Sequence, residues 1–348
     1  MLPQNLAPLR RKLLNWYDKN CRDLPWRRGG DPYAIWISET MLQQTQVATV
    51  LSYYEKFMRE FPTIEALDRA PLERVLRVWS GLGYYRRAEN LKKAARQISS
   101  NHGGKLPNQF AALRQLPGIG EYTAGAILSI AFTQRYAAVD GNVRRVLSRV
   151  LDITDERKLR LAASTFVPRS RPGDFNQALM ELGAMLCAPR EPICRACPLS
   201  AHCAARRQQG QAVRRQQPQP LKFKAVTWPL AIVRRGGKIL LRRRGVDGLL
   251  ARLWELPGGE NHRRSSPPAF LRSQLQPLNC PIRRLQRVGE IRHSITYRRI
   301  RAPIYLIDCP AGVKLRLPNK YWRWVEPRAL ANLPISSMTA KAIKSLLP

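Results

Sequence analysis

Acidic residues are scarce in this sequence. Its 348 residues include 24 Asp and Glu but 60 Lys and Arg, which gives a formal net charge of +36 at pH 7. With 44% hydrophobic residues, the chain has enough apolar surface to fold despite that charge. An excess of positive charge on this scale favours an anionic partner. Because no apolar run approaches the length of a membrane span, we expect no membrane partner and a nucleic acid in the cytoplasm or nucleoid.

Cysteines are also few, and their number is odd. Seven cysteines without a recognisable export signal argue against a disulfide framework. Four of them lie within 17 residues, in the spacing C-x6-C-x2-C-x5-C: Cys187, Cys194, Cys197 and Cys203. Four thiols this close favour a metal site over four independent buried thiols. Zinc and a 4Fe-4S cluster both accept four thiolates, so the spacing alone leaves both open.

Composition divides the chain into two domains. Residues 1–205 show helical periodicity and no strand-like alternation, and they end in the cysteine loop 187–203. Residues 206–222 are rich in Gln, Arg and Pro and predict an extended linker. From residue 223 the apolar period changes to two, so residues 223–348 predict an α/β domain. The expected helices span 6–19, 32–42, 47–60, 72–79, 87–99, 122–132, 157–166, 175–186 and 337–347, and the expected strands 227–233, 238–241, 285–291 and 300–307.

One turn in the helical part is suited to bind an anion. In Leu116-Pro-Gly-Ile-Gly-Glu121, Gly118 and Gly120 let the backbone turn tightly and expose unpaired N–H groups. The next helix directs its positive N-terminal end to the same place, where a nucleic-acid phosphate would fit. A helical corner with a glycine cap is the simpler alternative, because a short glycine motif is a weak signal.

Two carboxylates form a candidate acid–base pair. Breaking an N-glycosidic bond needs an acid to protonate the leaving base and a carboxylate to face the cationic sugar. Glu39, on an apolar helix, should have its pKa raised by desolvation and keep a proton. Asp140, at the start of a helix, should stay ionised. The ordinary alternatives are a half-exposed helical glutamate and a plain N-cap aspartate.

Six segments resemble, in order and spacing, the MutY-type adenine DNA glycosylases, which belong to the helix-hairpin-helix, endonuclease III superfamily. The segments are SETMLQQTQVATV, GLGYYRRAENLKKAA, LPGIGEYTAGAIL, VDGNVRRVL, FNQALMELGAMLC and the cysteine loop. The resemblance implies a base excision repair enzyme that flips out adenine mispaired with 8-oxoguanine or guanine in double-stranded DNA and hydrolyses its glycosidic bond. It also implies a 4Fe-4S cluster held by the four cysteines, and we expect a monomer.

The same resemblance assigns roles to individual residues. Glu39 stands at the general acid and Asp140 at the stabiliser of the oxocarbenium ion, while Tyr122 and Asn142 line the sugar and the carboxylates. Gln43, Gln44 and Tyr84 match residues that enter the base stack, and Gly118 and Gly120 belong to the DNA-binding hairpin. Related bifunctional enzymes carry a lysine nucleophile where this chain has Tyr122. Because a phenol cannot form a Schiff base, a monofunctional glycosylase is expected.

The second domain resembles the Nudix-like C-terminal domain of the same family. GLLARLWELPGGE, residues 248–260, is similar to the opening of a Nudix fold, but no acid follows between residues 261 and 289. A Nudix hydrolase needs clustered glutamates for Mg²⁺, so pyrophosphatase activity is not expected. The family's reader loop for 8-oxoguanine usually contains Phe-Ser-His. Here residues 292–297 carry Thr296 and then Tyr297 in place of the histidine, which leaves the strength of lesion preference open.

Three other functions stay open at this point. One is an iron–sulfur glycosylase for a different base, such as thymine opposite guanine. The second is a DNA-binding relative without catalytic activity, which the presence of both Glu39 and Asp140 disfavours. The third and weakest is a Nudix pyrophosphatase.

Overall fold

The fold is described from a computed structural model in which residues 5–208, 222–262, 265–279, 282, 284–310, 315, 317 and 321–345 are placed. Contacts divide the chain into two units. One contains Met1–Arg69 and Asn90–Gln219, and the other contains Ala70–Glu89 and Pro220–Pro348. Residues 70–89, expected in the helical domain, thus group with the second unit. Residues 209–221 of the expected linker 206–222 lie outside the described residues.

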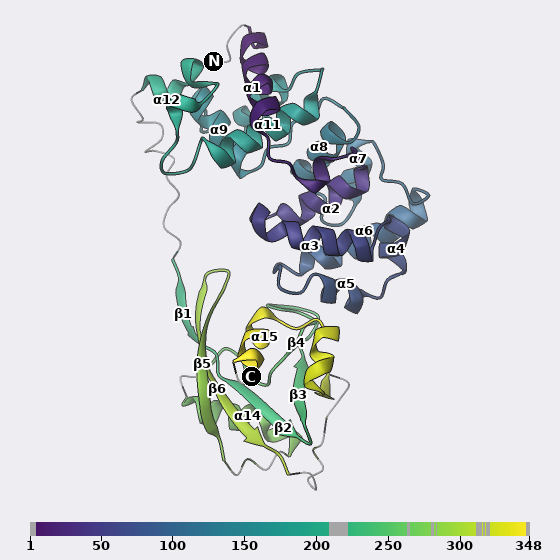
Figure 1. The fold of residues 1–348 in the computed structure, drawn as a ribbon, viewed down its shortest axis with the longest axis vertical. Helices are drawn as coiled ribbons and strands as arrows, with labels where there is room; N and C mark the ends of the chain where they lie inside the picture. Colours follow the sequence, from purple (N-terminus) through teal and green to yellow (C-terminus); the bar gives the residue numbers. More distant parts are fainter. Residues whose placement is uncertain are drawn as a thin grey trace. The chain divides into compact units, whose positions relative to one another are not determined.

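Residues 5–208 form helices joined by loops, as predicted for the domain 1–205 (Figure 1). Most predicted helices start and end within two residues of the observed ones. The main differences are α11, which begins three residues earlier, and α4 and α12, which were not predicted. The helices are α1 (Ala7–Asn20), α2 (Pro32–Leu42), α3 (Val47–Glu60), α4 (Ile64–Arg69), α5 (Leu72–Val78), α6 (Arg86–Asn101), α7 (Phe110–Gln115), α8 (Glu121–Ile130), α9 (Gly141–Leu151), α10 (Glu156–Phe166), α11 (Pro172–Met185) and α12 (Ala204–Arg207). Among the described residues, no helix has the length and apolar character needed to cross a bilayer.

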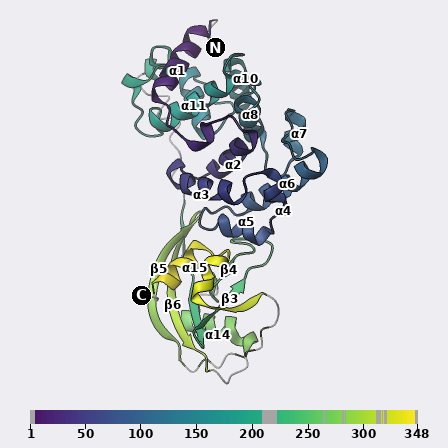
Figure 2. The ribbon, with the colours of Figure 1, turned by 45° about the vertical axis from the view of Figure 1, so that its right-hand side comes forward.

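Helix α11 organises the helical unit. It packs against α1, α8 and α9, and α8 also packs against α2. Figure 2 shows α2, α8 and α11 next to one another. Apolar side chains of α1, α9, α10 and α11 form one core, including Leu13, Leu147, Phe166 and Phe175. Burying such side chains stabilises the fold by about 1.5–3 kcal/mol each. This packing fixes the helix ends from which the polar side chains of the site project.

The second unit contains a mixed seven-stranded sheet. Its strands are β1 (Lys224–Thr227), β2 (Leu230–Arg235), β3 (Lys238–Arg243), β4 (Trp254–Glu255), β5 (Gln286–Ile295), β6 (Arg298–Asp308) and β7 (Trp322–Val325). Strands β2 and β3 form the predicted antiparallel hairpin, with Gly236 and Gly237 at positive φ in its turn. Strands β1 and β2 run along the same neighbour, β6, and both are parallel to it. The single strand predicted over 227–233 is therefore two strands, because Pro229 breaks it.

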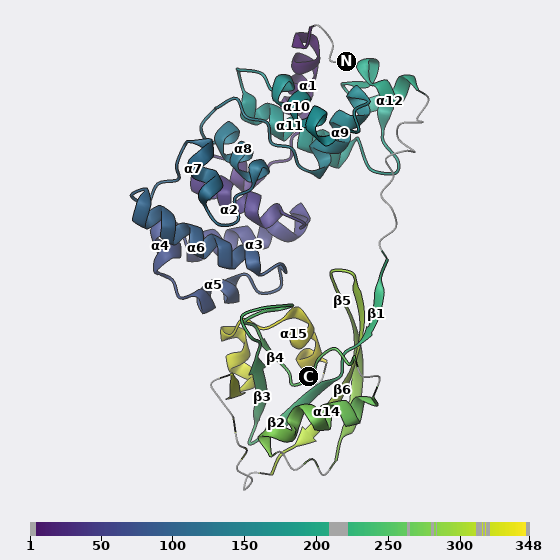
Figure 3. The same ribbon diagram turned by 180° about the vertical axis from the view of Figure 1, so that it is seen from behind.

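Two helices cover opposite faces of this sheet (Figures 1 and 3). Helix α14 (Pro267–Leu275) packs through Leu271 and Leu275 on one face, and α15 (Ser337–Lys344) packs through Met338 and Ile343 on the other. Helix α14 was not predicted. Helix α15 was predicted over 337–347, of which residues 346 and 347 lie outside the described residues. The α/β expectation is confirmed by this layered arrangement.

Candidate active site

A cavity of about 1010 Å³ in the helical unit gathers the predicted catalytic residues. Its walls include Glu39, Tyr122, Asp140 and Asn142, and also Gln43 and Gln44. Glu39 and Asp140 are about a hundred positions apart in the sequence, yet both line the same open cavity. This size suits a site for a small planar group such as a nucleobase.

Helix α2 carries Glu39, whose side chain lines the cavity. The helix begins at Pro32 because Asp31 caps it, accepting hydrogen bonds from the backbone N–H groups of Tyr33 (3.1 Å) and Ala34 (3.2 Å). Residues 33–41 of α2 are all buried, and Glu39 is only 5% exposed. Burial raises the pKa of Glu39 to about 7, and the nearby Asp140 charge adds to the rise; the Tyr122 hydrogen bond and Arg27 oppose it. A carboxyl with this pKa can hold a proton and release it near neutral pH.

Tyr122 connects α8 to this carboxyl. It lies in the first turn of α8, and its hydroxyl donates a hydrogen bond to Glu39 Oε2. The Met180 sulfur lies 3.8 Å from the same hydroxyl. Burial and the neighbouring carboxylates raise the pKa of Tyr122 well above its ordinary value. The phenol therefore stays protonated and acts as a donor that holds Glu39 in place.

Asp140 occupies the N-cap of α9. Its Oδ1 accepts from the Val143 N–H at 2.7 Å, and its Oδ2 accepts from Asn142 Nδ2 at 3.0 Å. Burial raises the pKa of Asp140, while these hydrogen bonds and the Arg145 charge lower it. The position of Asp140 at a helix terminus was predicted from the sequence, but its burial was not. Burial has the larger effect, so the pKa of Asp140 is raised on balance. Two hydrogen bonds leave lone pairs of this carboxylate facing the cavity.

Further polar side chains that were not predicted line the cavity, among them Arg22, Arg27, Gln177 and Glu181. Glu181 is 1% exposed and pairs with Arg22 and with Arg27, whose Nη1 lies 2.9 Å from Glu181 Oε1. Arg27 Nε also donates to Gln177 Oε1 at 3.0 Å. Burial raises the pKa of Glu181, but the two arginines outweigh it and the pKa lies below its usual value. Gln177 and Glu181 are one turn apart on α11 and both are buried, and this spacing of polar residues among apolar ones was the available signal.

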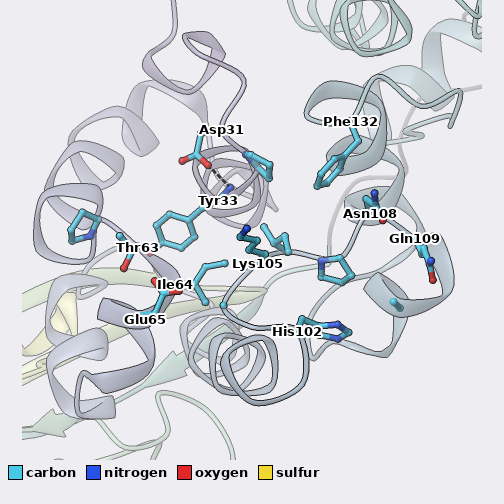
Figure 4. A pocket seen from close by; sticks show the side chains of 16 residues that line it. Asp31, Tyr33, Thr63, Ile64, Glu65, His102, Lys105, Asn108, Gln109 and Phe132 are labelled. Carbon is cyan, nitrogen blue, oxygen red and sulfur yellow. Dashed lines mark hydrogen bonds between the residues drawn. The ribbon is translucent and has the colours of Figure 1, made fainter.

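A second cavity of about 800 Å³ lies at the other end of α2 (Figure 4). Its labelled side chains include Asp31, Glu65, His102 and Lys105. Asp31 and Glu39 are eight residues apart on α2, roughly 12 Å along its axis. This cavity contains neither member of the carboxylate pair, both of which line the first cavity.

Comparison with known proteins relates this site to DNA repair enzymes. Residues 37–169 match the HhH-GPD superfamily of base excision DNA repair proteins, and residues 229–345 match the NUDIX domain. The adenine DNA glycosylase of Rattus norvegicus is 36% identical over 98% of this chain and 78% of its own length. That of Homo sapiens is 34% identical over 97% of this chain and 74% of its own length. The chain belongs to the adenine DNA glycosylase family.

Solved structures support the fold of the helical part. A thermostable thymine-DNA glycosylase superposes with a TM-score of 0.55 and 32% identity, over 58% of this chain and 97% of that one. Endonuclease III in a non-covalent DNA complex superposes with a TM-score of 0.52 and 21% identity, over 60% of this chain and 99% of that one. The second likeness concerns the fold alone. Together they place this adenine DNA glycosylase family member on the endonuclease III fold.

The four cysteines gather beside α9, where the family resemblance implied a cluster. Cys187, Cys197 and Cys203 pack against the helical core, and the charges of all four cysteines influence one another. Burial raises the pKa of the Cys197 thiol to about 11, so a thiolate there needs positive charge beside it. Among the described residues, no three His, Cys, Asp or Glu side chains are arranged to hold a single metal ion. Four thiolates are the ligand set of a 4Fe-4S cluster, in which each thiolate binds a different iron.

Two arginines of α9 hold the cysteine loop. Arg149 is 1% exposed and donates to the backbone oxygens of Ala188 (2.7 Å) and Pro189 (2.7 Å). Arg145 donates to Cys187 O at 2.8 Å and also to Asn142 Oδ1 at 2.8 Å. The loop and the cap residues of α9 are thus joined through the side chains of one helix.

The predicted DNA-contacting glycines occupy the turn between α7 and α8. Gly118 has φ +83°, and a Cβ there would lie 2.9 Å from the Asn90 Cβ. Gly120 is the N-cap of α8, with an ordinary φ of −84°. Gly118 therefore needs glycine both for its positive φ and for the close approach of Asn90, whereas Gly120 does not need it for its φ.

The remaining predicted contacts do not line the catalytic cavity. Tyr84 belongs to residues 70–89, is 46% exposed, and has φ +45°. Residues 292–295, expected in a reader loop, are the end of strand β5; Thr296 and Tyr297 form the turn to β6. Thr296 has φ +53°, and Tyr297 is 47% exposed with the Arg298 guanidinium 4.5 Å from its ring centre. These side chains stand out from the sheet at a hairpin tip.

Proposed function

We propose that this chain is a monofunctional DNA glycosylase that excises adenine mispaired with 8-oxoguanine or guanine. The observation that carries the proposal is the shared cavity of Glu39 and Asp140, in which Glu39 has a pKa of about 7. Family membership supports adenine as the base. The substrate is double-stranded DNA, to which the positive charge and the turn at Gly118 and Gly120 supply phosphate contacts.

In the proposed mechanism, adenine rotates out of the stack and enters the cavity. Glu39, oriented by Tyr122, gives its proton to the leaving base and afterwards takes a proton from water. Asp140, held by Asn142, faces the deoxyribose and stabilises its developing positive charge. Gln177 offers its side-chain amide to the edge of the base, and Glu181 holds Arg22 and Arg27 in the cavity wall. Gln43, Gln44 and Tyr84 fill the stack that adenine leaves.

The four cysteines would hold a 4Fe-4S cluster. Bound there, the cluster would cross-link the loop 187–203 to the core, and no step of base removal uses it. We further propose that the hairpin tip with Thr296 and Tyr297 reads the base opposite adenine, and that the protein works as a monomer on chromosomal DNA in the bacterial cytoplasm.

Base release from defined duplexes tests the proposal. Duplexes pair adenine with 8-oxoguanine, guanine or thymine, and a fourth pairs thymine with guanine. We expect free adenine from the first two, little from the third, and none after Asp140→Asn. Strand cleavage should require added base, because Tyr122 cannot form a Schiff base.

The thymine–guanine duplex tests a second candidate. The solved thymine-DNA glycosylase is 32% identical to this chain over the helical part, so release of thymine is the specific alternative. Free thymine without free adenine would replace the proposed substrate with that one.

A further inference from the structure

Residues 70–89 belong to the same compact unit as the sheet, although they come from the helical part of the sequence. Three side-chain contacts within this unit connect the segment to the sheet and its loops. They are Trp254 Nε1 to Glu73 Oε1 (3.2 Å), Ser80 Oγ to Ile335 O (2.5 Å) and Arg252 Nε to Glu89 Oε1 (3.5 Å). Two of the contacts precede Tyr84 in the sequence and one follows it, so the segment is anchored on both sides of that residue.

Two of these contacts meet at the β4 edge of the sheet. Trp254 of β4 pairs with Ile335 as an isolated parallel bridge. Trp254 is buried, and its indole N–H needs an acceptor because an unpaired buried donor is costly. Glu73, in the first turn of α5, supplies that acceptor, and Ser80 donates to the same bridge through Ile335 O. Helix α5 and the turn after it therefore complete this edge.

The third contact is an ion pair between two buried atoms. Neither Arg252 Nε nor Glu89 Oε1 makes a hydrogen bond among the described residues, so loss of either side chain would leave the other atom buried without a partner. Arg252 reaches Glu89 from a loop in which Leu250 and Arg252 have φ +56° and +63°. Residues other than glycine rarely adopt this conformation, and such strain is concentrated at functional positions. The loop therefore fixes Arg252 against the start of α6.

The turn that presents Tyr84 lies between these anchors. Gly83 and Tyr84 have φ +74° and +45°. Trp79 Nε1 donates to Gly83 O at 3.0 Å, and the Arg87 guanidinium lies 5.4 Å from the Tyr84 ring centre. These contacts hold the turn in one conformation while the Tyr84 side chain stays exposed. The unit that carries this turn also carries the hairpin tip between β5 and β6.

We propose that Arg252 and Glu89 are positioning residues that make Tyr84 and the β5–β6 hairpin tip act on DNA as one body. This inference rests on the proposed function, in which the tip reads the base opposite adenine and Tyr84 enters the base stack. When the tip engages 8-oxoguanine, the same unit brings Tyr84 to the stack. The preference for 8-oxoguanine over guanine thus depends on the ion pair as well as on the tip. Neither residue of the pair lines the catalytic cavity.

Two measurements on the full chain test this coupling in Glu89→Gln, Arg252→Gln and the double variant. The first is single-turnover adenine release with 8-oxoguanine or guanine opposite adenine, expressed as the ratio of the two rates. The second is hydrogen–deuterium exchange of residues 79–86 in the free protein, which reports on the Tyr84 turn without requiring catalysis. Arg234→Gln is the matched control, because Arg234 belongs to the same unit and pairs with an exposed carboxylate, Asp308, at 2.9 Å.

We expect each single variant to lower the rate ratio roughly fivefold or more and to speed exchange in residues 79–86. The double variant should match the more affected single variant, because both substitutions break the same pair. Arg234→Gln should change neither quantity. Thermal unfolding checks that the variants are folded. Ser80→Ala removes a different anchor of the same segment and should shift both quantities in the same direction, whether or not the ion-pair variants fold.

A rate ratio that stays at the wild-type value in the folded variants would overturn the inference and leave adenine release by the wild type intact. Losses that add up in the double variant would also contradict it, since the two residues would then act separately. A wild-type chain that releases no adenine would refute the proposed function instead. Exchange would then decide the positioning role, which faster exchange in the variants supports and unchanged exchange overturns.

Discussion

The hydrogen bond from Tyr122 to Glu39 should set the pH range of base release. The donated hydrogen bond stabilises the ionised carboxyl, and therefore lowers the pKa of Glu39 below the value that burial alone would give. Tyr122→Phe removes the donor and keeps the ring. The pKa of Glu39 should rise as a result.

The size of this rise follows from the strength of the hydrogen bond. A hydrogen bond to a charged group contributes about 1.5–3 kcal/mol, and one pKa unit corresponds to about 1.4 kcal/mol. The expected rise is therefore about one to two units. The general acid must be protonated, so the wild-type rate should fall as the pH rises through about 7. In Tyr122→Phe that fall should move to between about pH 8 and pH 9.

Single-turnover release of adenine, measured across pH, tests this expectation. The plateau at low pH should also drop in Tyr122→Phe, because Glu39 loses its orienting partner. Tyr33→Phe is the matched control. Tyr33 is a buried phenol on α2 whose hydroxyl donates to the Phe61 backbone oxygen at 2.8 Å, and it does not line the catalytic cavity. A fall that stays near pH 7 in Tyr122→Phe, or moves to lower pH, would refute the reasoning.

Three other substitutions have defined outcomes. Folding raises the pKa of Glu39 from 4.5 to about 7, so the protonated side chain stabilises the fold fully below pH 4.5, and this contribution is lost as the pH rises through 7. At pH 8 the buried carboxyl is ionised and destabilises the fold. Glu39→Gln should therefore raise the free energy of unfolding at pH 8 by up to about 3 kcal/mol, measured in urea. Gly118→Ala, at φ +83°, should lower the free energy of unfolding by about 1 kcal/mol or more and weaken DNA binding. Gly245→Ala is the control, since Gly245 has open space around it and no positive φ, and it should change neither quantity. Arg149→Ala should lower the bound iron per chain and the visible absorbance, while exposed Arg195→Ala should retain both.

Much of the helical unit follows from local signals in the sequence. Asp31 and Pro32 fix the start of α2, and Asp140 fixes the start of α9, because caps and first-turn prolines act within a few residues. Helix α14 had the same signals, since Ser266 caps it and Pro267 opens it. No helix was predicted there, although both signals are present in the sequence.

Other features depend on contacts distant in the sequence. The ion pair of Arg22 and Glu181 joins positions 159 residues apart, so no local sequence pattern predicts it. Burial of Asp140 arises from the packing of α9 and its neighbours, and it reverses the pKa shift that the helix terminus alone predicts. Strand β4 has two residues and exists because β3 pairs with it. Such elements carry too little local information to be predicted.

The central claim is that Glu39 and Asp140 act on one nucleotide in one step, Glu39 on its base and Asp140 on its sugar. Single-turnover adenine release from duplexes with 8-oxoguanine opposite adenine tests it most directly, using Glu39→Gln, Asp140→Asn and the double variant. We expect each single variant to lose roughly 10²-fold or more in rate, and the double variant to lose little beyond the more damaging single substitution. A near-wild-type rate in either single variant would contradict the claim.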